Sequence, residues 1–436
     1  MYNNDISNAF IVYPKGGGRK KKRVLLIDFI KRRNAMKKTL FVLLVILIAV
    51  PLVLWAGGRK KKAEKVEEAA EEISAEEMNE PDPWFTEKRT VMYKYIKDFD
   101  IKWRGLMDEH PVYDKDLLLT KGEVAQIKKG NYKIAYIGQN LTGEYSQALI
   151  GGCHDTADYL GMEWVAETDA NFDAAKQKSD VETVLALKPD VIVGYPVDLT
   201  TGAEIFRPII DAGIPLVIVS NRPFDYVHGK DFVANCTMNP YDGGYFAGKM
   251  CVEDIPPDAE VGIITFEADY FVLNVIDDGF KDALQELGPN LTVHEMGYVN
   301  WQDCGGIAAA MVQKYPNITA MYSTWFDPVM VMAADLRAVG REDIKLYTVN
   351  VNVPSLIDLV EPDGMIKGMT SDFPWNIGMN MAIAASKALL GKTAPEMVVV
   401  PSIPVTPDNV RELWGVIMRN VPMPDSLDDA LKAVGK

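Results

Sequence analysis

The sequence predicts an α/β fold made of two doubly wound lobes, each built on a parallel sheet. Two observations support this prediction. From residue 132 onward, apolar runs of strand length alternate with amphipathic segments of helix length. Several of these runs, such as residues 190–195 and 215–220, are rich in valine and isoleucine, as strands buried on both faces of a parallel sheet require. Because about ten such strands exceed one typical sheet, two lobes are expected.

The elements can be placed along the chain in order. The expected strands cover residues 132–138, 161–166, 190–195, 215–220, 232–236, 260–265, 291–297, 319–324, 344–350 and 365–370. The expected helices cover residues 144–160, 173–187, 201–212, 271–287, 302–314 and 327–339, with a further tail helix at 407–419. In sheets of this kind, ligands bind beyond the carboxyl ends of the strands. The residues that follow each strand are therefore the first candidates for a functional site.

Composition excludes several classes of protein. The chain has 436 residues, of which 48% are hydrophobic and 25% charged, and this excludes a disordered, collagen-like or multi-span membrane chain. The formal net charge of −15 argues against nucleic-acid binding, which normally requires a basic surface. The charge is unevenly distributed, because residues 1–65 contain 16 basic and only 3 acidic side chains. The N-terminal part therefore has to be interpreted separately.

That N-terminal part predicts export. Residues 40–56 are uncharged and mostly aliphatic and follow Lys37 and Lys38, so we interpret residues 36–62 as a signal peptide or a membrane anchor. We interpret residues 1–35 as untranslated upstream sequence, with Met36 as the start, or as a basic cytoplasmic tail. Residues 63–130 are expected to form an acidic spacer followed by a partly helical extension. The expected location is periplasmic or extracytoplasmic, with or without anchoring by residues 40–56.

The residues after the expected strands are polar, aromatic and rich in amides. Amides, carboxylates and a guanidinium supply paired donors and acceptors for vicinal hydroxyl groups, and aromatic rings suit the apolar face of a sugar or polyol. Each of these residues taken singly is also a common turn or cap residue, but their recurrence indicates a shared role. The candidates of this kind are Asn140, Tyr145, Asn221, Arg222, Asn239, Trp301, Trp325, Asp327, Asn350, Asn352 and Asp372.

Residues 131–402 resemble the type I periplasmic sugar-binding proteins, specifically the ribose-binding group, which are solute receptors of ATP-binding-cassette importers. The resemblance lies in ADYLGM at 157–162, PDVIVGYP at 189–196, AGIPLVIVSNRP at 212–223, GGYFAGKM at 243–250, DDGFKDAL at 277–284 and ADLRAVG at 334–340. It implies a three-strand hinge between discontinuous lobes, with residues 131–237 plus 373–402 forming the N-terminal lobe. Residues 238–372 plus 403–436 would form the C-terminal lobe and tail. It also implies that ligand closes the lobes by contacting both.

The resemblance also assigns roles within the site. Asn221 and Arg222 stand where the family holds adjacent sugar hydroxyls, and Tyr145 and Trp301 would enclose the ring. Three departures make a simple ribose pocket doubtful: Ser146 replaces an aromatic residue, Asn274 is the nearest polar residue to a missing arginine, and an asparagine, either Asn350 or Asn352, replaces an aspartate. A different pentose, a hexose or a cyclic polyol such as inositol is therefore left open. The implied partners are this small molecule and a membrane permease of the ATP-binding-cassette type, with the receptor itself monomeric and without a cofactor or metal.

Other functions are less well supported by the residues. The four histidines are scattered, and Cys153, His154 and Asp155 are neighbours on an expected helix, where successive side chains point in different directions. This disfavours a carbohydrate-acting enzyme. A sugar-responsive transcription regulator would need an N-terminal DNA-binding motif, in place of which the chain has an apolar export segment. A receptor that presents its ligand to a membrane sensor cannot be separated from a transport receptor by sequence. The four cysteines permit a disulfide, although buried free thiols are favoured.

Overall fold

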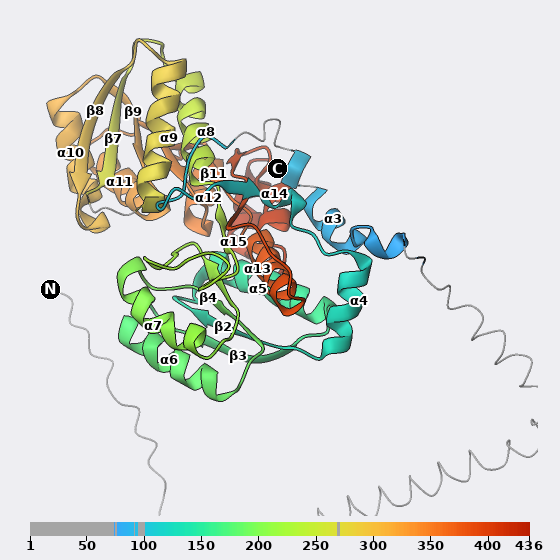
Figure 1. Ribbon diagram of the computed structural model, residues 1–436. Helices are drawn as coiled ribbons and strands as arrows, with labels where there is room; N and C mark the ends of the chain where they lie inside the picture. The colour runs from blue at the N-terminus through green and yellow to red at the C-terminus, as the bar shows by residue number, and fades with distance from the viewer. Residues whose placement is uncertain (1–73, 75, 91, 95–100, 268–270) are drawn as a thin grey trace, which may run out of the picture. The chain divides into compact units, whose positions relative to one another are not determined.

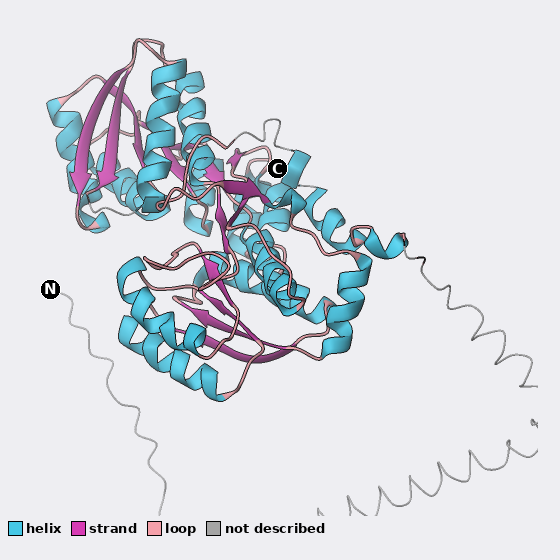
Figure 2. Ribbon diagram, viewed as in Figure 1, coloured by secondary structure: helices cyan, strands magenta, loops and turns pink. Residues whose placement is uncertain are grey.

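The computed structural model describes residues 74, 76–90, 92–94, 101–267 and 271–436. The expected export segment, and most of the acidic spacer, lie outside these residues. Within the described part of the chain, no helix is long and apolar enough to cross a membrane. The described residues form an α/β architecture with two separate sheets, which appear as two groups of arrows flanked by helices in Figures 1 and 2.

The first sheet has seven strands in the order β1-β12-β6-β5-β4-β2-β3, all parallel. The strands are β1 (Pro111–Tyr113), β2 (Lys133–Gly138), β3 (Glu163–Asp169), β4 (Val191–Gly194), β5 (Leu216–Val219), β6 (Asn235–Met238) and β12 (Met397–Val400). Alternate residues of each strand point to opposite faces. Ile134 and Tyr136 join one hydrophobic cluster, whereas Ala135 and Ile137 join another. Both faces are therefore buried, which explains the continuous apolar runs in the sequence.

Helices cover both faces of this sheet. One face packs against α5 (Gly143–Tyr159) and α13 (Pro374–Leu389), and the other packs against α6 (Ala174–Ala186) and α7 (Leu199–Asp211). The contact between α5 and α13 is unusually close, because a Cβ atom on Gly152 would lie 1.8 Å from the carbonyl oxygen of Trp375. A side chain at residue 152 would clash with the backbone of α13, so glycine is required at this contact between the two helices.

The second sheet has six strands in the order β13-β11-β10-β9-β7-β8, of which only β13 is antiparallel to its neighbour. The strands are β7 (Glu260–Phe266), β8 (Thr292–Tyr298), β9 (Ile318–Ser323), β10 (Lys345–Val349), β11 (Ile366–Ser371) and β13 (Ile403–Val405). The helices are α8 (Pro240–Asp254), α9 (Phe271–Leu287), α10 (Cys304–Lys314), α11 (Phe326–Ala338) and α12 (Val353–Val360). Gly244 of α8 lies against α9 as closely as Gly152 lies against α13, since its Cβ would stand 1.8 Å from the oxygen of Ile276.

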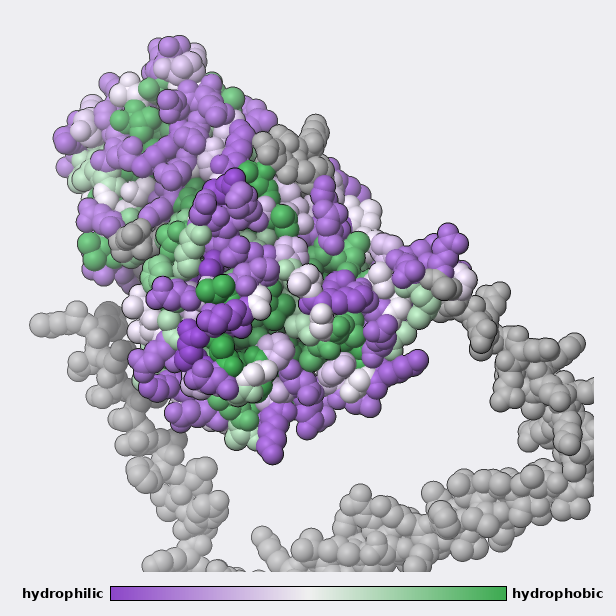
Figure 3. All heavy atoms as spheres, in the orientation of Figure 1, coloured by the Kyte–Doolittle hydropathy of each residue, from purple (hydrophilic) through white to green (hydrophobic). Residues whose placement is uncertain are grey.

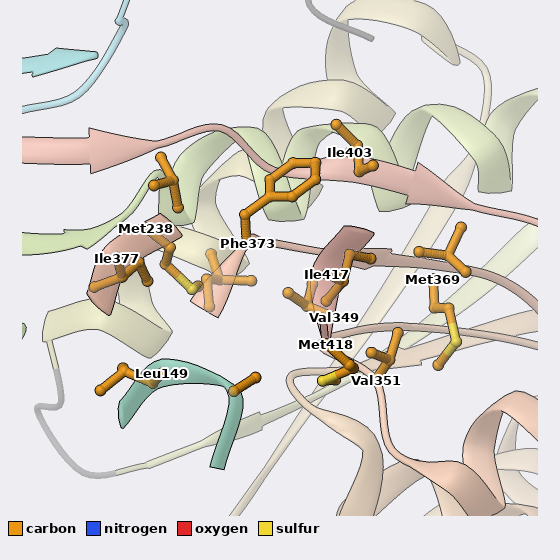
Figure 4. Close-up of a cluster of buried hydrophobic side chains, with 14 of the residues drawn as sticks. Leu149, Met238, Val349, Val351, Met369, Phe373, Ile377, Ile403, Ile417 and Met418 are labelled. Atoms are coloured by element: carbon orange, nitrogen blue, oxygen red, sulfur yellow. The ribbon is translucent and has the colours of Figure 1, made fainter. Parts of the chain in front are cut away.

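The chain passes between the two sheets three times, at residues 238–240, 371–374 and 400–403. The first and third crossings are bonded to each other, because Ser402 Oγ donates to the carbonyl oxygen of Asn239 at 2.8 Å. A single hydrophobic cluster runs through this region, and Figure 4 shows its members from both lobes, the crossings and the tail. The labelled side chains include Leu149 of α5, Phe373 of the second crossing and Val349 of β10.

Two further segments pack on this framework. The N-terminal extension contains α3 (Pro83–Thr90), β1 and α4 (Lys121–Gly130), and Trp84 of α3 stacks on Tyr159 with ring centroids 4.6 Å apart. The C-terminal tail forms α14 (Val410–Ile417) and α15 (Asp425–Ala433). On the face shown in Figure 3, hydrophilic residues predominate, and hydrophobic residues are more frequent toward the middle of the described body.

The ten strands expected from the sequence are all present, as are the six expected helices of the body and the tail helix. The expectation missed β1, β12 and β13, and it did not place α8, α12 and α13. The four cysteines are buried and unpaired as free thiols.

Candidate functional site

The carboxyl ends of the central strands in the first sheet bring three loops together. Ser220 follows β5 with a left-handed backbone (φ +52°), so the chain turns sharply before Asn221 and Arg222. Asn221 is buried, and its Nδ2 donates to the carbonyl oxygen of Pro196 at 2.9 Å and to Gln139 Oε1 at 3.3 Å. The loops that follow β2, β4 and β5 are thereby fixed to one another.

Arg222 is the central charged group of this edge. Its Nη1 donates to Glu109 Oε1 at 2.5 Å and to Glu396 Oε1 at 3.0 Å, and its Nη2 donates to the carbonyl oxygen of Tyr226 at 2.5 Å. The residue is 9% exposed, and its Nε atom is buried without a hydrogen-bond partner among the described residues. Two carboxylates compensate the charge, while one strong donor is left without an acceptor.

Arg222 and Asn221 line a cavity of about 210 Å³. Its walls come from the loops after β4 and β5, the first residues of β6 and β12, the first turn of α9, and the N-terminal extension. Seven of the fourteen lining residues are polar and seven are apolar, and small-molecule sites likewise combine apolar walls with placed polar groups. The lining residues are Leu106, Met107, Glu109, Asp198, Leu199, Thr200, Ser220, Asn221, Arg222, Phe224, Asn235, Phe271, Val272 and Met397.

The loop after β2 supplies a second group of candidates. Asn140 Oδ1 accepts hydrogen bonds from the backbone nitrogen of Thr142 at 2.9 Å and from its hydroxyl at 2.8 Å, so Asn140 shapes the turn before α5. Tyr145 and Ser146 lie half-buried in the first turn of α5. The hydroxyl of Tyr145 donates to Asp372 Oδ2 at 3.0 Å. The structure thus brings Tyr145 and Asp372 together from positions far apart in the sequence.

Asp372 lies at the second crossing and is 1% exposed. Burial raises the pKa of its carboxyl group to about 6, an effect that the hydrogen bond from Tyr145 only partly offsets. Burial also raises the pKa of Tyr145 well above its ordinary value, so this hydroxyl remains a donor. Asp372 Oδ1 is buried without a partner among the described residues. The crossing therefore holds one acceptor that a bound molecule could satisfy.

The raised pKa predicts a specific pH dependence of stability. In the unfolded chain the carboxyl group of Asp372 titrates near its ordinary pKa of 3.8, whereas in the fold it titrates near 6. Between these values the folded state holds a proton that the unfolded state has lost, so stability falls as the pH rises through this window. The contribution is about 3 kcal/mol at most. Urea unfolding at pH 4 and pH 7.5 should show a smaller difference for Asp372→Asn than for the wild type, and equal differences would contradict this assignment.

Asn239, at the first crossing, is fully buried and bonded to the N-terminal extension. Its Oδ1 accepts from Trp103 Nε1 at 2.8 Å and from the backbone nitrogen of Asp242 at 3.2 Å, and its Nδ2 donates to the hydroxyl of Tyr113 at 2.9 Å. These bonds occupy Oδ1 twice and use one of the two N–H groups of Nδ2. Asn239 therefore acts in this structure as an attachment point for the extension.

The second lobe contributes aromatic and polar candidates at its own strand ends. Trp325 follows β9 with φ +51°, a strained conformation for a bulky residue, and its ring meets the edges of Phe266 and Tyr298. Asp327 is half-buried in the first turn of α11, and burial raises the pKa of its carboxyl group. Trp301 is 37% exposed. Both tryptophan rings have the chemistry to stack on the apolar face of a sugar or polyol ring.

Three amides of this lobe take different positions. Asn352 caps α12, since its Oδ1 accepts from the backbone nitrogen of Ser355 at 2.9 Å and Ser355 Oγ accepts in return from the nitrogen of Asn352. Asn350 has φ +64°, and its Oδ1 is buried without a partner among the described residues. Asn274 lies half-buried in the first turn of α9. Between the two alternatives at this strand end, the structure gives Asn352 a structural role and leaves Asn350 Oδ1 available.

Sequence reasoning missed several residues that line the cavity. Three of them, Leu106, Met107 and Glu109, lie in the extension, which was expected only to pack on the main domain. Another, Asn235, lies inside a strand rather than after one. Phe271, the first residue of α9, also lines the cavity. Only Asn235 carried a usable signal, because it is a polar residue within an otherwise apolar strand.

The structure also shows the surroundings of Cys153, His154 and Asp155, the three neighbours that the sequence analysis weighed as a catalytic group. Cys153 is fully buried, and burial raises the pKa of its thiol far above the ordinary value. His154 pairs with Glu167 at 2.6 Å, whereas Asp155 accepts from Trp375 Nε1 at 3.0 Å. The three neighbours therefore contact different partners. Across the described part of the chain, no group of three or more metal-ligating side chains is close enough to hold an ion.

Two lobes built on mainly parallel sheets, joined by three crossings and carrying polar and aromatic residues after their strands, define a two-lobed binding protein. Residues 134–393 match the model of the periplasmic binding protein domain, and the chain belongs to this family. It is 23% identical over 225 residues to the D-ribose/D-allose-binding protein of Pseudomonas aeruginosa, covering 51% of this chain and 70% of that one. Its relatives are solute-binding proteins and not enzymes.

Solved structures show the same fold. An arabinose-binding protein from Geobacillus stearothermophilus matches with a TM-score of 0.59 and 19% identity, covering 65% of this chain and 99% of that one. A solute-binding protein of an ABC transporter from Agrobacterium vitis, bound with α-D-tagatopyranose, matches with a TM-score of 0.57 and 18% identity, covering 67% and 100%. The fold is therefore that of solute-binding proteins of ABC sugar transporters.

Proposed function

We propose that this chain captures a neutral sugar or cyclic polyol between its lobes and delivers it to an ATP-binding-cassette importer. The observation that carries the proposal is the hydrogen bonding of the Arg222 guanidinium group. Glu109 and Glu396 compensate its positive charge, so an anionic ligand is not needed to neutralise the site. Its Nε nevertheless has no acceptor among the described residues, and Arg222 is one of the residues that line the cavity. A neutral hydroxyl group satisfies such a donor without disturbing the charge balance.

The other groups of the site fit the same class of ligand. Asp372 Oδ1 and Asn350 Oδ1 are acceptors without partners among the described residues, and hydroxyl groups donate to such oxygens. The rings of Tyr145, Trp301 and Trp325 would cover the apolar face of the molecule. Asn239 and Asn352 stay in the set although each also makes structural bonds, as Asn140 and Asn221 do. The ligand-contacting set that we propose is Asn140, Tyr145, Ser146, Asn221, Arg222, Asn239, Asn274, Trp301, Trp325, Asp327, Asn350, Asn352 and Asp372.

The remaining parts of the proposal follow from the family. A receptor of this kind acts outside the cytoplasm, with residues 36–62 serving as export signal or anchor, and works as a monomer with a membrane permease. We further propose that ligand stabilises a closed arrangement of the lobes by contacting both of them. D-ribose, D-allose, D-arabinose, D-tagatose, allitol and myo-inositol are the ligands to test first, because they represent the pentose, hexose and polyol classes.

A thermal-shift screen of the purified chain against these six compounds tests the proposal. Binding to the native state alone stabilises it by RT ln(1 + [L]/Kd), which is about 2.7 kcal/mol at a hundredfold excess over Kd. We expect at least one compound to raise the melting temperature by several degrees, and an anionic control such as D-galacturonate to have no effect. A chain that responds to none of the six, or only to the anionic control, would contradict the proposal.

A further inference from the structure

The N-terminal extension forms one wall of the cavity that contains Arg222. Leu106, Met107 and Glu109 line it together with Asn221 and Arg222. Glu109 is 3% exposed, and its carboxylate bonds directly to the guanidinium group at 2.5 Å. The segment is therefore more than a linker between the export segment and the lobes.

The backbone of residues 105–109 is built around the Glu109 carboxylate. The nitrogen of Gly105 donates to the carbonyl oxygen of Glu109 at 3.0 Å, and the nitrogen of Met107 donates to Glu109 Oε2 at 2.8 Å. Asp108 completes the turn in the left-handed conformation, with φ +64°. A Cβ atom on Gly105 would lie 2.1 Å from Glu109 Oε2. Glycine at this position leaves the space in which the carboxylate is held.

This loop is attached on both sides. Before it, Trp103 Nε1 donates to Asn239 and the Trp103 ring packs against Phe271. After it, β1 pairs in parallel with β12, and the Tyr113 hydroxyl donates to Asp242 Oδ2 at 2.6 Å. Because these contacts reach both the first crossing and the helices that follow it, the loop has a fixed position beside the cavity.

Two residues of the cavity lining each carry a buried polar atom that lacks a partner among the described residues: Arg222 Nε, which is a donor, and Asn235 Oδ1, which is an acceptor. Asn235 is 1% exposed, and its Nδ2 is already used by the carbonyl oxygen of Ser220 at 3.2 Å. Unsatisfied buried groups of this kind are rare and costly in native proteins. A hydroxyl group is both an acceptor and a donor, so it has the chemistry that each of these two atoms requires.

We infer that the loop at residues 105–109 is part of the ligand site, where Arg222 and Asn235 bind one hydroxyl group of the ligand and Glu109 positions Arg222. The inference rests on the proposed function and adds to it a specificity-determining subsite made in part by the extension. The apolar side chains of Leu106, Met107 and Phe271 would contact the carbon skeleton beside that hydroxyl. Two of the three polar residues of this subsite, Glu109 and Asn235, are not among the candidates that were chosen because they follow a strand.

The first test compares two carboxylates that bond to the same guanidinium nitrogen. Glu109 faces the cavity, whereas Glu396 lies outside its lining, and its side chain is 34% exposed. Isothermal titration is performed with whichever of the six screened compounds gives the largest thermal shift. We expect Glu109→Gln to weaken binding about tenfold or more, because the guanidinium loses its buried charged partner. The matched control Glu396→Gln should change the affinity less than about threefold.

The second test addresses the hydroxyl group itself. For the wild type, one mono-deoxy derivative of the same compound should bind about tenfold more weakly than its parent. The Asn235→Ala variant should bind the parent compound more weakly than the wild type does. It should bind the mono-deoxy derivative with the same affinity as the wild type does. A merely structural role for Asn235 would weaken every derivative equally.

Gly105→Ala, which displaces the carboxylate without removing its charge, should reproduce the effect of Glu109→Gln if the chain remains folded by circular dichroism.

The outcomes separate the two proposals. If the wild type binds none of the six compounds, the proposed function fails and this inference fails with it. If the wild type binds but Glu109→Gln and Asn235→Ala bind with unchanged affinity, only the inference is overturned. Tighter binding by Glu109→Gln would also overturn it, since the carboxylate would then be a competitor of the ligand.

Discussion

Replacing Arg222 with alanine is expected to abolish the ligand-induced thermal shift and to lower the free energy of unfolding by about 3–5 kcal/mol. The guanidinium makes three hydrogen bonds in a buried position, and Glu109, its main carboxylate partner, is 3% exposed. Removal of one member of a buried ion pair leaves the other charge without compensation. We expect ligand binding to be lost as well, because the Nε donor, which has no acceptor among the described residues, disappears with the side chain.

Urea unfolding and thermal-shift measurements of Arg222→Ala check both effects. The double variant Arg222→Ala with Glu109→Gln should recover part of the lost stability, because no buried carboxylate then remains unpaired. It should not recover binding. A single variant that keeps its response to the screened compounds would show that Arg222 lies outside the ligand site.

Replacing Asp114 with alanine is expected to lower the free energy of unfolding by a similar amount, about 3–5 kcal/mol. Asp114 is fully buried and accepts hydrogen bonds from Arg89 Nε at 2.9 Å, from the hydroxyl of Tyr93, and from Asn380 Nδ2 at 3.1 Å. Arg89 belongs to the extension and Asn380 to α13. Without the carboxylate, the buried guanidinium loses its charge partner, and the extension loses one of its polar connections to the first lobe.

The exposed neighbour Asp116 provides a control, since it lies two residues away outside this network. Asp116→Ala should change the stability by less than about 0.5 kcal/mol. Limited proteolysis should cleave Asp114→Ala within residues 76–130 faster than the wild type or the control. Equal stability and equal cleavage of the three proteins would show that the extension is held by its apolar contacts alone.

Much of the fold could be predicted because most strands are continuous apolar runs that a parallel sheet requires. The missed elements have physical reasons. Residues 374–386 of α13 are all buried, so this helix lacks the polar face that makes a helical period visible. The strands β1 and β13 have three residues each, too few for a pattern. β1 forms only because β12 offers it an edge.

The candidate site could be predicted only where its residues follow strands. That rule identified Asn221 and Arg222, which share one cavity, and Asp372, which meets Tyr145. It could not identify Glu109, because the contact with Arg222 spans more than a hundred residues and depends on how the extension packs. Roles as caps and attachments, such as those of Asn352 and Asn239, depend on neighbours that a polar residue type does not reveal.

Hydrogen exchange of the purified chain, with and without the screened compound that raises the melting temperature most, tests the central claim most directly. The account predicts that bound ligand slows amide exchange at residues 105–109, 140–146, 221–224 and 371–373. A second cavity, lined by residues around 213–216 and 228–233, lies apart from the strand ends that carry the proposed site. Protection confined to that region, or a bound compound that protects none of the predicted segments, would contradict the account.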